Sequence, residues 1–186
     1  DNIVLKAAQA LRSRYGAPEQ GASINLEKNL PVASGIGGGS ANAAATLRAL
    51  CTLWRLKPAA DDLAELALSL GADVPMCLLQ KPARVTGIGE IIEPLSIAPL
   101  HLVLANPGLS ISTPDVFNQL AEKENSAIGE MESPVDGWIP FLIGQRNDLQ
   151  TAATALCPPV QTCLEALQNC SGSRFERMSG SGATCF

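Results

Sequence analysis

Apolar residues recur every three or four positions in several stretches of the chain, a spacing that predicts amphipathic helices. The first predicted helix covers residues 1–15 and ends where glycine and proline occur close together. Another helix begins at Asp61 or Asp62 and ends at Gly71, a residue type common just after helices. Two more helices are predicted on either side of Pro158-Pro159, because proline interrupts helical hydrogen bonding.

Other stretches alternate between apolar and polar residues or form short apolar runs, which predicts strands. Residues 22–28 alternate, and residues 84–93 are predicted to form a hairpin that turns near Gly87-Ile88-Gly89. Residues 100–105 are predicted to be a short buried strand, and residues 177–186 a strand, a glycine turn and a second strand.

A glycine-rich segment, residues 30–39, leads directly into an alanine-rich stretch that is predicted to be helical. Ser40 is the predicted N-cap of that helix. The start of a helix carries unpaired N–H groups and a partial positive charge, and glycine lets a ligand approach the backbone closely. The segment therefore predicts an anion site, for which phosphate is the usual ligand.

The two familiar phosphate-binding patterns do not fit this segment. A Walker loop needs Lys followed by Ser or Thr after its last glycine, whereas Gly39 is followed by Ser40 and Ala41. The dinucleotide fingerprint needs an acidic residue about 20 positions later. Asp61-Asp62 lies near that distance but is predicted to open another helix.

Further candidate residues each allow two interpretations. Asp73 follows a predicted helix end, and it is either a turn aspartate that binds its own backbone or a carboxylate at the edge of a pocket. Thr113 is the predicted N-cap of a helix with Pro114 at its first position. Phe117, one turn later, either packs in the core or contacts a ligand. His101 lies in a predicted strand and is interpreted as structural.

Composition limits the classes of protein that the chain can represent. Its 186 residues, 46% of them hydrophobic, suffice for one large or two small domains. The net charge of −5 argues against a nucleic-acid partner, and no apolar run reaches the roughly 18 residues of a membrane span. The six cysteines form no C-x-x-C pair and there is one histidine, so we expect free thiols in a reducing cytoplasm rather than a zinc site.

Three stretches together resemble the superfamily of galactokinase, homoserine kinase, mevalonate kinase and phosphomevalonate kinase. The pattern P-x-x-x-G-I-G-G-G-S-x-x-A-A at residues 31–44 is similar to its phosphate-binding motif. R-M-S-G-S-G-A-T-C-F at residues 177–186 is similar to its C-terminal glycine motif. G-A-D-V-P at residues 71–75, V-T-G-I-G-E at residues 85–90 and N-P-G at residues 106–108 resemble the branch of this superfamily that acts on a cytidyl compound.

The resemblance implies a two-lobed α+β fold. Residues 1–84 would form an ATP-binding lobe similar to a ribosomal-protein fold and truncated at its start. Residues 85–186 would form a ferredoxin-like substrate lobe truncated at its end. The sequence leaves open whether the protein is a monomer or a homodimer.

The resemblance also implies an activity and its residues. The enzyme would use ATP and Mg²⁺ to phosphorylate the tertiary 2-hydroxyl of a diphosphocytidyl methylerythritol, on the non-mevalonate route to isoprenoids. Asp73 would accept or orient the hydroxyl proton, Ser40 would lie near Mg²⁺, and Thr113 and Phe117 would contact the cytidine. The implied nucleotide contacts are Pro31, Val32, Ala33, Ser34, Gly35, Ile36, Gly37, Gly38, Gly39, Ser40 and Ala41.

The sequence departs from the superfamily pattern in two places. The strand that carries the superfamily's catalytic lysine, and the Tyr-His pair that follows it, have no counterpart here, so we expect a piece of a longer protein. Ala41 stands where a second serine is common. Two alternatives therefore stay open: another kinase of the superfamily with a different acceptor, and a nucleotide-binding fragment without catalytic activity.

Overall fold

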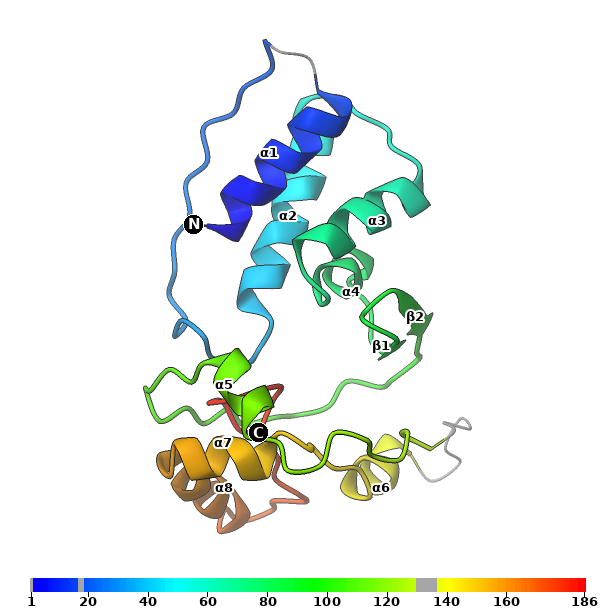
Figure 1. The fold of residues 1–186 in the computed structure, drawn as a ribbon. Helices are drawn as coiled ribbons and strands as arrows, with labels where there is room; N and C mark the ends of the chain where they lie inside the picture. The colour runs from blue at the N-terminus through cyan, green and yellow to red at the C-terminus, as the bar shows by residue number, and fades with distance from the viewer. Residues whose placement is uncertain (1, 17–18, 130–136) are drawn as a thin grey trace. The chain divides into compact units, whose positions relative to one another are not determined.

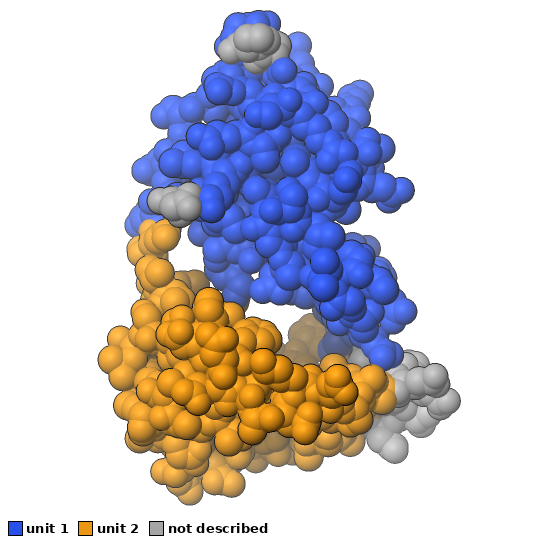
Figure 2. All heavy atoms as spheres, in the orientation of Figure 1, with its two compact units in different colours: residues 1–27, 37–97 blue, residues 28–36, 98–186 orange. Residues whose placement is uncertain are grey.

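The structure is a computed structural model that describes residues 2–16, 19–129 and 137–186 (Figure 1). It divides into two compact units, which Figure 2 colours separately. Unit 1 comprises residues 1–27 and 37–97, and unit 2 comprises residues 28–36 and 98–186. Among the described residues, no helix combines the length and apolar character needed to cross a membrane.

Unit 1 is mainly helical. Its helices pack around a core that contains both alanines and larger apolar residues, and Ala7, Ala43 and Ala44 have no exposed surface. Small side chains let α1 and α2 lie close together, as Figure 1 shows. The helices are α1 (Ile3–Tyr15), α2 (Gly38–Leu53), α3 (Ala60–Leu70) and α4 (Val74–Leu79).

A short antiparallel hairpin completes unit 1 and confirms the predicted turn. Strand β1 (Ala83–Thr86) pairs with β2 (Ile91–Pro94), with Thr86 opposite Ile91. The Glu90 carboxylate accepts a hydrogen bond from the Ile88 N–H at 2.6 Å, which closes the loop between the strands. Helices with a small antiparallel sheet give the α+β class that the sequence predicts.

Unit 2 has its own core, built from helices and a C-terminal hairpin. Cys185, at the centre of that hairpin, bridges antiparallel to both Met178 and Ala105. Met178, Val116, Val160 and Cys185 are among its most buried side chains. The helices are α5 (Thr113–Asn118), α6 (Trp138–Ile143), α7 (Gln150–Leu156) and α8 (Pro159–Gln168).

Two predicted strands are wrong. Residues 22–28 belong to none of the strands of the described chain. In residues 100–105 only Ala105 is paired, and Val103 and Leu102 are 67% and 58% exposed. An apolar run forms a buried strand only if neighbouring segments cover both of its faces. Few of the described residues cover residues 100–104, so this run stays exposed.

Two predicted helix caps are also wrong, each by a small shift. Helix α2 begins after Gly37, whose φ of 70° makes it a left-handed cap, so Ser40 lies inside the first turn. Helix α5 begins after Ser112, whose hydroxyl accepts the Asp115 N–H, so Thr113 is the first helical residue. Helix α6 was not predicted, because its six residues are almost continuously apolar and show no helical period.

Candidate functional site

Within unit 2, the C-terminal hairpin holds the first part of the glycine segment. The Thr184 N–H donates to the Ser34 carbonyl at 3.1 Å. The Ser179 hydroxyl donates to the Gly35 carbonyl at 2.8 Å. Two segments that lie far apart in the sequence, and that both resemble superfamily motifs, therefore meet through one backbone–backbone hydrogen bond and one side-chain hydrogen bond.

These bonds determine where the amides of the segment point. The peptide bonds on either side of Gly35 are trans, so each N–H points opposite to the carbonyl of the same peptide group. Because the carbonyls of Ser34 and Gly35 face the hairpin, the N–H groups of Gly35 and Ile36 face away from it. The hairpin thus presents two backbone donors on the opposite side of the loop.

Glycine is required at position 35 for steric reasons. Its φ is 71°, and a Cβ there would lie 2.5 Å from the carbonyl oxygens of both Ser179 and Gly182. Neither backbone atom can move aside as a flexible side chain can. Gly35 therefore serves the contact between loop and hairpin.

The remaining glycines serve a different purpose, at the start of α2 in unit 1. Apart from chain neighbours and the backbone of α2 itself, a Cβ at Gly37 or Gly38 would meet no described atom within 4 Å, and a Cβ at Gly39 would reach only the Ile3 side chain at 3.9 Å. Packing within unit 1 therefore does not demand glycine at residues 38 and 39. Open space beside a backbone is what a closely approaching ligand needs.

The N–H groups at this helix start are also unused. Across the described residues, no hydrogen bond has the N–H of any residue from Gly35 to Ser40 as its donor. The first intrahelical donor is Ala41, which binds the Gly37 carbonyl at 2.8 Å. Free amides and a helix start together can bind an anionic group such as phosphate.

Asp73 lies in unit 1, just before α4, with an exposed side chain. Its backbone carbonyl accepts the Cys77 N–H at 3.2 Å, but its carboxylate caps no N–H of the helix, so the turn-aspartate interpretation is wrong. Burial, and secondarily the negative charge of Asp73, raise the pKa of the Cys77 thiol. Arg48 of α2 donates to the Cys77 carbonyl at 3.2 Å and so ties α4 to α2.

Thr113 and Phe117 lie together on α5 in unit 2. The Thr113 hydroxyl is 2.7 Å from the Ser181 hydroxyl in the glycine turn of the hairpin. Phe117 is 50% exposed, so of its two interpretations core packing is wrong, while contact with a ligand stays a prediction. Its side chain lines a hollow of about 710 Å³ whose wall includes Ser179 and Gly180.

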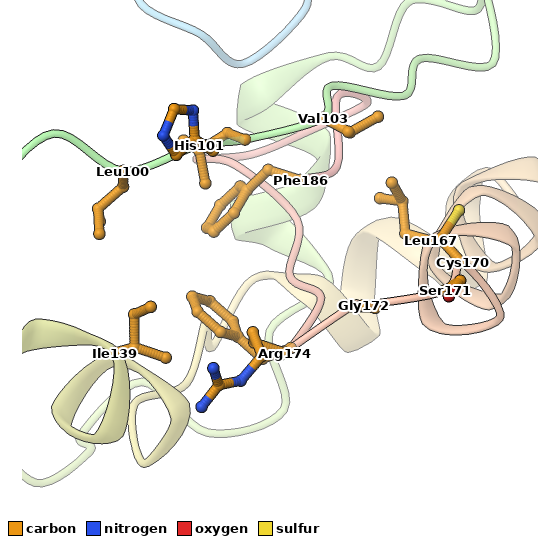
Figure 3. A pocket seen from close by; sticks show the side chains of 13 residues that line it. Leu100, His101, Val103, Ile139, Leu167, Cys170, Ser171, Gly172, Arg174 and Phe186 are labelled. Carbon is orange, nitrogen blue, oxygen red and sulfur yellow. The ribbon is translucent and has the colours of Figure 1, made fainter.

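A smaller pocket of about 220 Å³ lies elsewhere in unit 2 and is lined mainly by apolar residues. Figure 3 shows Leu100 and His101 on one side of it and Ile139 and Arg174 on the other. His101 is exposed and is not buried in a strand. None of the residues predicted to bind nucleotide or cytidine lines this pocket.

Sequence reasoning missed the polar residues that brace the hairpin. Asn106 donates to the Thr184 hydroxyl at 2.8 Å, and Asn147 donates to the Met178 and Gly180 carbonyls at 2.7 and 2.8 Å. Gln150 accepts the Met178 N–H at 2.9 Å. Position offers a weak signal for two of them, because asparagine next to Pro107 or before a helix is expected to bind nearby backbone.

Comparison with known proteins identifies the family. Residues 2–81 match the GHMP kinases N terminal domain. A solved structure entitled crystal structure of 4-(cytidine 5'-diphospho)-2C-methyl-D-erythritol kinase matches the whole chain with a TM-score of 0.77, at 33% identity, over 68% of its own length. The chain belongs to the GHMP kinase family.

Several curated relatives of this chain carry the name 4-diphosphocytidyl-2-C-methyl-D-erythritol kinase. Relatives of that name from Cereibacter sphaeroides, Ruegeria pomeroyi and Rhizobium johnstonii are 50%, 51% and 49% identical over the whole chain. The chain spans 66%, 65% and 62% of their respective lengths.

Proposed function

We propose that this GHMP kinase transfers the γ-phosphoryl group of ATP to the tertiary 2-hydroxyl of 4-diphosphocytidyl-2-C-methyl-D-erythritol, a step of non-mevalonate isoprenoid biosynthesis. The observation that carries the proposal is the glycine segment, whose N–H groups from Gly35 to Ser40 are not donors to any described atom. Such a run of free donors at a helix start can bind the anionic oxygens of a polyphosphate. The names of the relatives supply the acceptor.

The nucleotide would lie along residues 31–41, with its phosphate oxygens accepting the free N–H groups. The open space at Gly38 and Gly39 would let those oxygens approach the backbone. Ser40 is half-buried, and its hydroxyl makes no hydrogen bond to the described residues, so it could contact Mg²⁺. Bound Mg²⁺ would neutralise charge on the phosphates and so favour the transfer.

Asp73 would act on the acceptor hydroxyl. No hydrogen bond or ion pair within the described part of the chain occupies its carboxylate, so an incoming hydroxyl would meet a free acceptor. A tertiary alcohol is a poor nucleophile, and holding it in line with the phosphoryl group matters as much as taking its proton. The carboxylate would do both by accepting the hydroxyl hydrogen.

The cytidine would be held by α5. The exposed ring of Phe117 offers a face on which a pyrimidine base can stack. The Thr113 hydroxyl, already 2.7 Å from Ser181, can accept one hydrogen bond and donate another. A cytoplasmic location would suit this role, because the cysteines are free thiols.

The decisive experiment assays phosphoryl transfer to a panel of alcohols that includes the cytidyl compound, homoserine and mevalonate. We expect turnover of the cytidyl compound alone, and turnover of either other alcohol would contradict the proposed acceptor. Asp73→Asn should lower kcat by about 100-fold or more while ATP still binds, since general-base assistance contributes factors of this order. Asp61→Asn, an exposed residue in the first turn of α3, is the matched control and should leave kcat unchanged.

A further inference from the structure

We propose that Asn147 is a positioning residue for the nucleotide site, acting through the C-terminal hairpin rather than by touching ATP. The inference rests on the proposed function for its effect on ATP, but its structural core can be tested without any ligand. Asn147 lies three residues before α7, and all its contacts described below are within unit 2.

Both the nitrogen and the oxygen of the Asn147 side-chain amide make hydrogen bonds. Its Nδ2 group donates to the Met178 carbonyl at 2.7 Å and to the Gly180 carbonyl at 2.8 Å. Its Oδ1 atom accepts the Leu149 N–H at 3.0 Å, which fixes the orientation of the amide. Both Nδ2 protons are therefore engaged, and two carbonyls of the hairpin turn depend on a single group.

The residue between those two carbonyls is Ser179, which holds the glycine segment. Its hydroxyl donates to the Gly35 carbonyl, and its own carbonyl accepts the Gly182 N–H at 3.0 Å. Because Asn147 holds the residues on each side of Ser179, it also fixes the position of the Ser179 hydroxyl relative to the Gly35 carbonyl. The Gly35 carbonyl and the Ile36 N–H belong to one planar peptide group. The position of the Ser179 hydroxyl therefore also sets the direction in which the Ile36 N–H points.

The contacts around Gly35 leave little room for adjustment. A Cβ on Gly180 would already lie 3.0 Å from the Gly35 carbonyl oxygen, so the turn and the loop are in close contact. A small shift of the turn would therefore move the loop or break its hydrogen bonds. Asn147 is well suited to prevent that shift, because it holds the turn from the side of α7.

Asn147→Asp is the sharpest variant, because it keeps the shape of the side chain while replacing two donors with acceptors. The carboxylate would then repel the Met178 and Gly180 carbonyls. Asn169→Asp is the matched control in the same unit. It makes the identical chemical change, and it also removes a donor to a backbone carbonyl, that of Glu165 at 2.8 Å.

Hydrogen exchange of the Thr184 amide provides the readout in the free protein, since this amide donates to the Ser34 carbonyl. We expect Asn147→Asp to accelerate that exchange by about tenfold or more, and to raise the KM for ATP by about tenfold with a smaller change in kcat. Asn169→Asp should change neither quantity. If Asn147→Asp does not fold, Asn147→Ala, which removes the donors without adding charge, is expected to accelerate Thr184 exchange in the same direction.

Two results would overturn the inference: unchanged Thr184 exchange in both Asn147 variants, or equal acceleration in Asn169→Asp. A protein that fails to bind ATP, yet shows the expected exchange pattern, would refute the proposed function and leave the bracing role of Asn147 supported. The two proposals can therefore fail separately.

Discussion

At the scale of single residues, the informative side chains are those that the fold does not use. Phe117 is half exposed although its helix buries Val116 completely. An exposed aromatic ring is available for contact with a ligand or another surface. Asp73 is similar, since its carboxylate caps no N–H of α4.

Replacing Phe117 tests this interpretation. We expect Phe117→Ala to raise the KM for the cytidyl compound by about 5- to 150-fold, the range that corresponds to a base–aromatic stacking energy of about 1–3 kcal/mol. The KM for ATP should change much less, and the free energy of unfolding should fall by less than about 1 kcal/mol because the ring is outside the core. Kinetics with each substrate varied, together with urea unfolding, give these quantities.

Leu109→Ala is the control for that change, because Leu109 is 49% exposed in the same unit. It should leave both KM values unchanged. Equal losses for ATP and the cytidyl compound in Phe117→Ala would mean that the ring supports the fold generally and does not select the base.

Residue-level reasoning from sequence succeeded where one residue type has one physical use. Gly35 needs a positive φ and close backbone contact, and the glycine pattern indicated such a need. It failed for helix caps, since Ser112 and Thr113 can both cap a helix and only the surrounding backbone decides between them. The contact of Asn147 with the hairpin could not be predicted, because the two carbonyls to which it donates lie more than 30 positions later in the chain.

At the scale of elements, the start of α2 combines helix chemistry with open space. Gly38 is the first residue of the helix, and a Cβ there would meet no described atom within 4 Å other than those of its chain neighbours and its own helix backbone. Alanine also favours helix more than glycine does. The protein alone therefore gives no reason for glycine at this position.

We expect Gly38→Ala to separate ligand binding from folding. The free energy of unfolding should change by less than about 1 kcal/mol, while the Kd for ATP should rise by about tenfold or more because the new methyl group crowds the phosphates. Isothermal titration and thermal unfolding measure the two effects. Gly21→Ala, whose added Cβ would also meet no described neighbour within 4 Å, should alter neither, and unchanged ATP binding in Gly38→Ala would exclude the helix start as the phosphate site.

Helices were easier to predict than strands for a physical reason. A helix satisfies its own backbone, so the apolar stripes of α1 and α3 were enough to indicate them. A strand needs a partner, and the exposed residues 100–104 show that an apolar run alone does not supply one. The hairpin of β1 and β2 was predictable because its partner lies next to it in the sequence.

At the scale of the whole molecule, the chain has two hydrophobic cores, one in each unit. Each core has cysteine thiols in or against it, and ionisation of these thiols would destabilise the folded state. In unit 2, burial chiefly, and the neighbouring Cys163 secondarily, raise the pKa of Cys185 from 9.0 to about 11. In unit 1, burial raises the pKa of Cys51 and Cys77. The proposed division into an ATP-binding lobe, residues 1–84, and a substrate lobe, residues 85–186, stays a prediction, since packing alone does not report ligands.

These thiols should make the protein less stable in alkaline solution. Between pH 9 and 11 the unfolded chain releases thiol protons that the folded chain keeps, so the free energy of unfolding falls as pH rises. We expect a loss on the order of 2 kcal/mol from Cys185 by pH 11. Urea unfolding at several pH values should show a shallower alkaline decline in Cys185→Ala than in Cys170→Ala, which replaces an exposed cysteine. Identical slopes would show that Cys185 does not govern this dependence.

The contact between Ser179 and Gly35 joins residues 144 positions apart. During synthesis on the ribosome, the loop at residues 31–36 emerges long before the hairpin that gives it shape. Closing so long an interval is slow compared with forming local helices, so this contact is expected among the last to form. The glycine segment would therefore take its final shape only after both cores have begun to assemble.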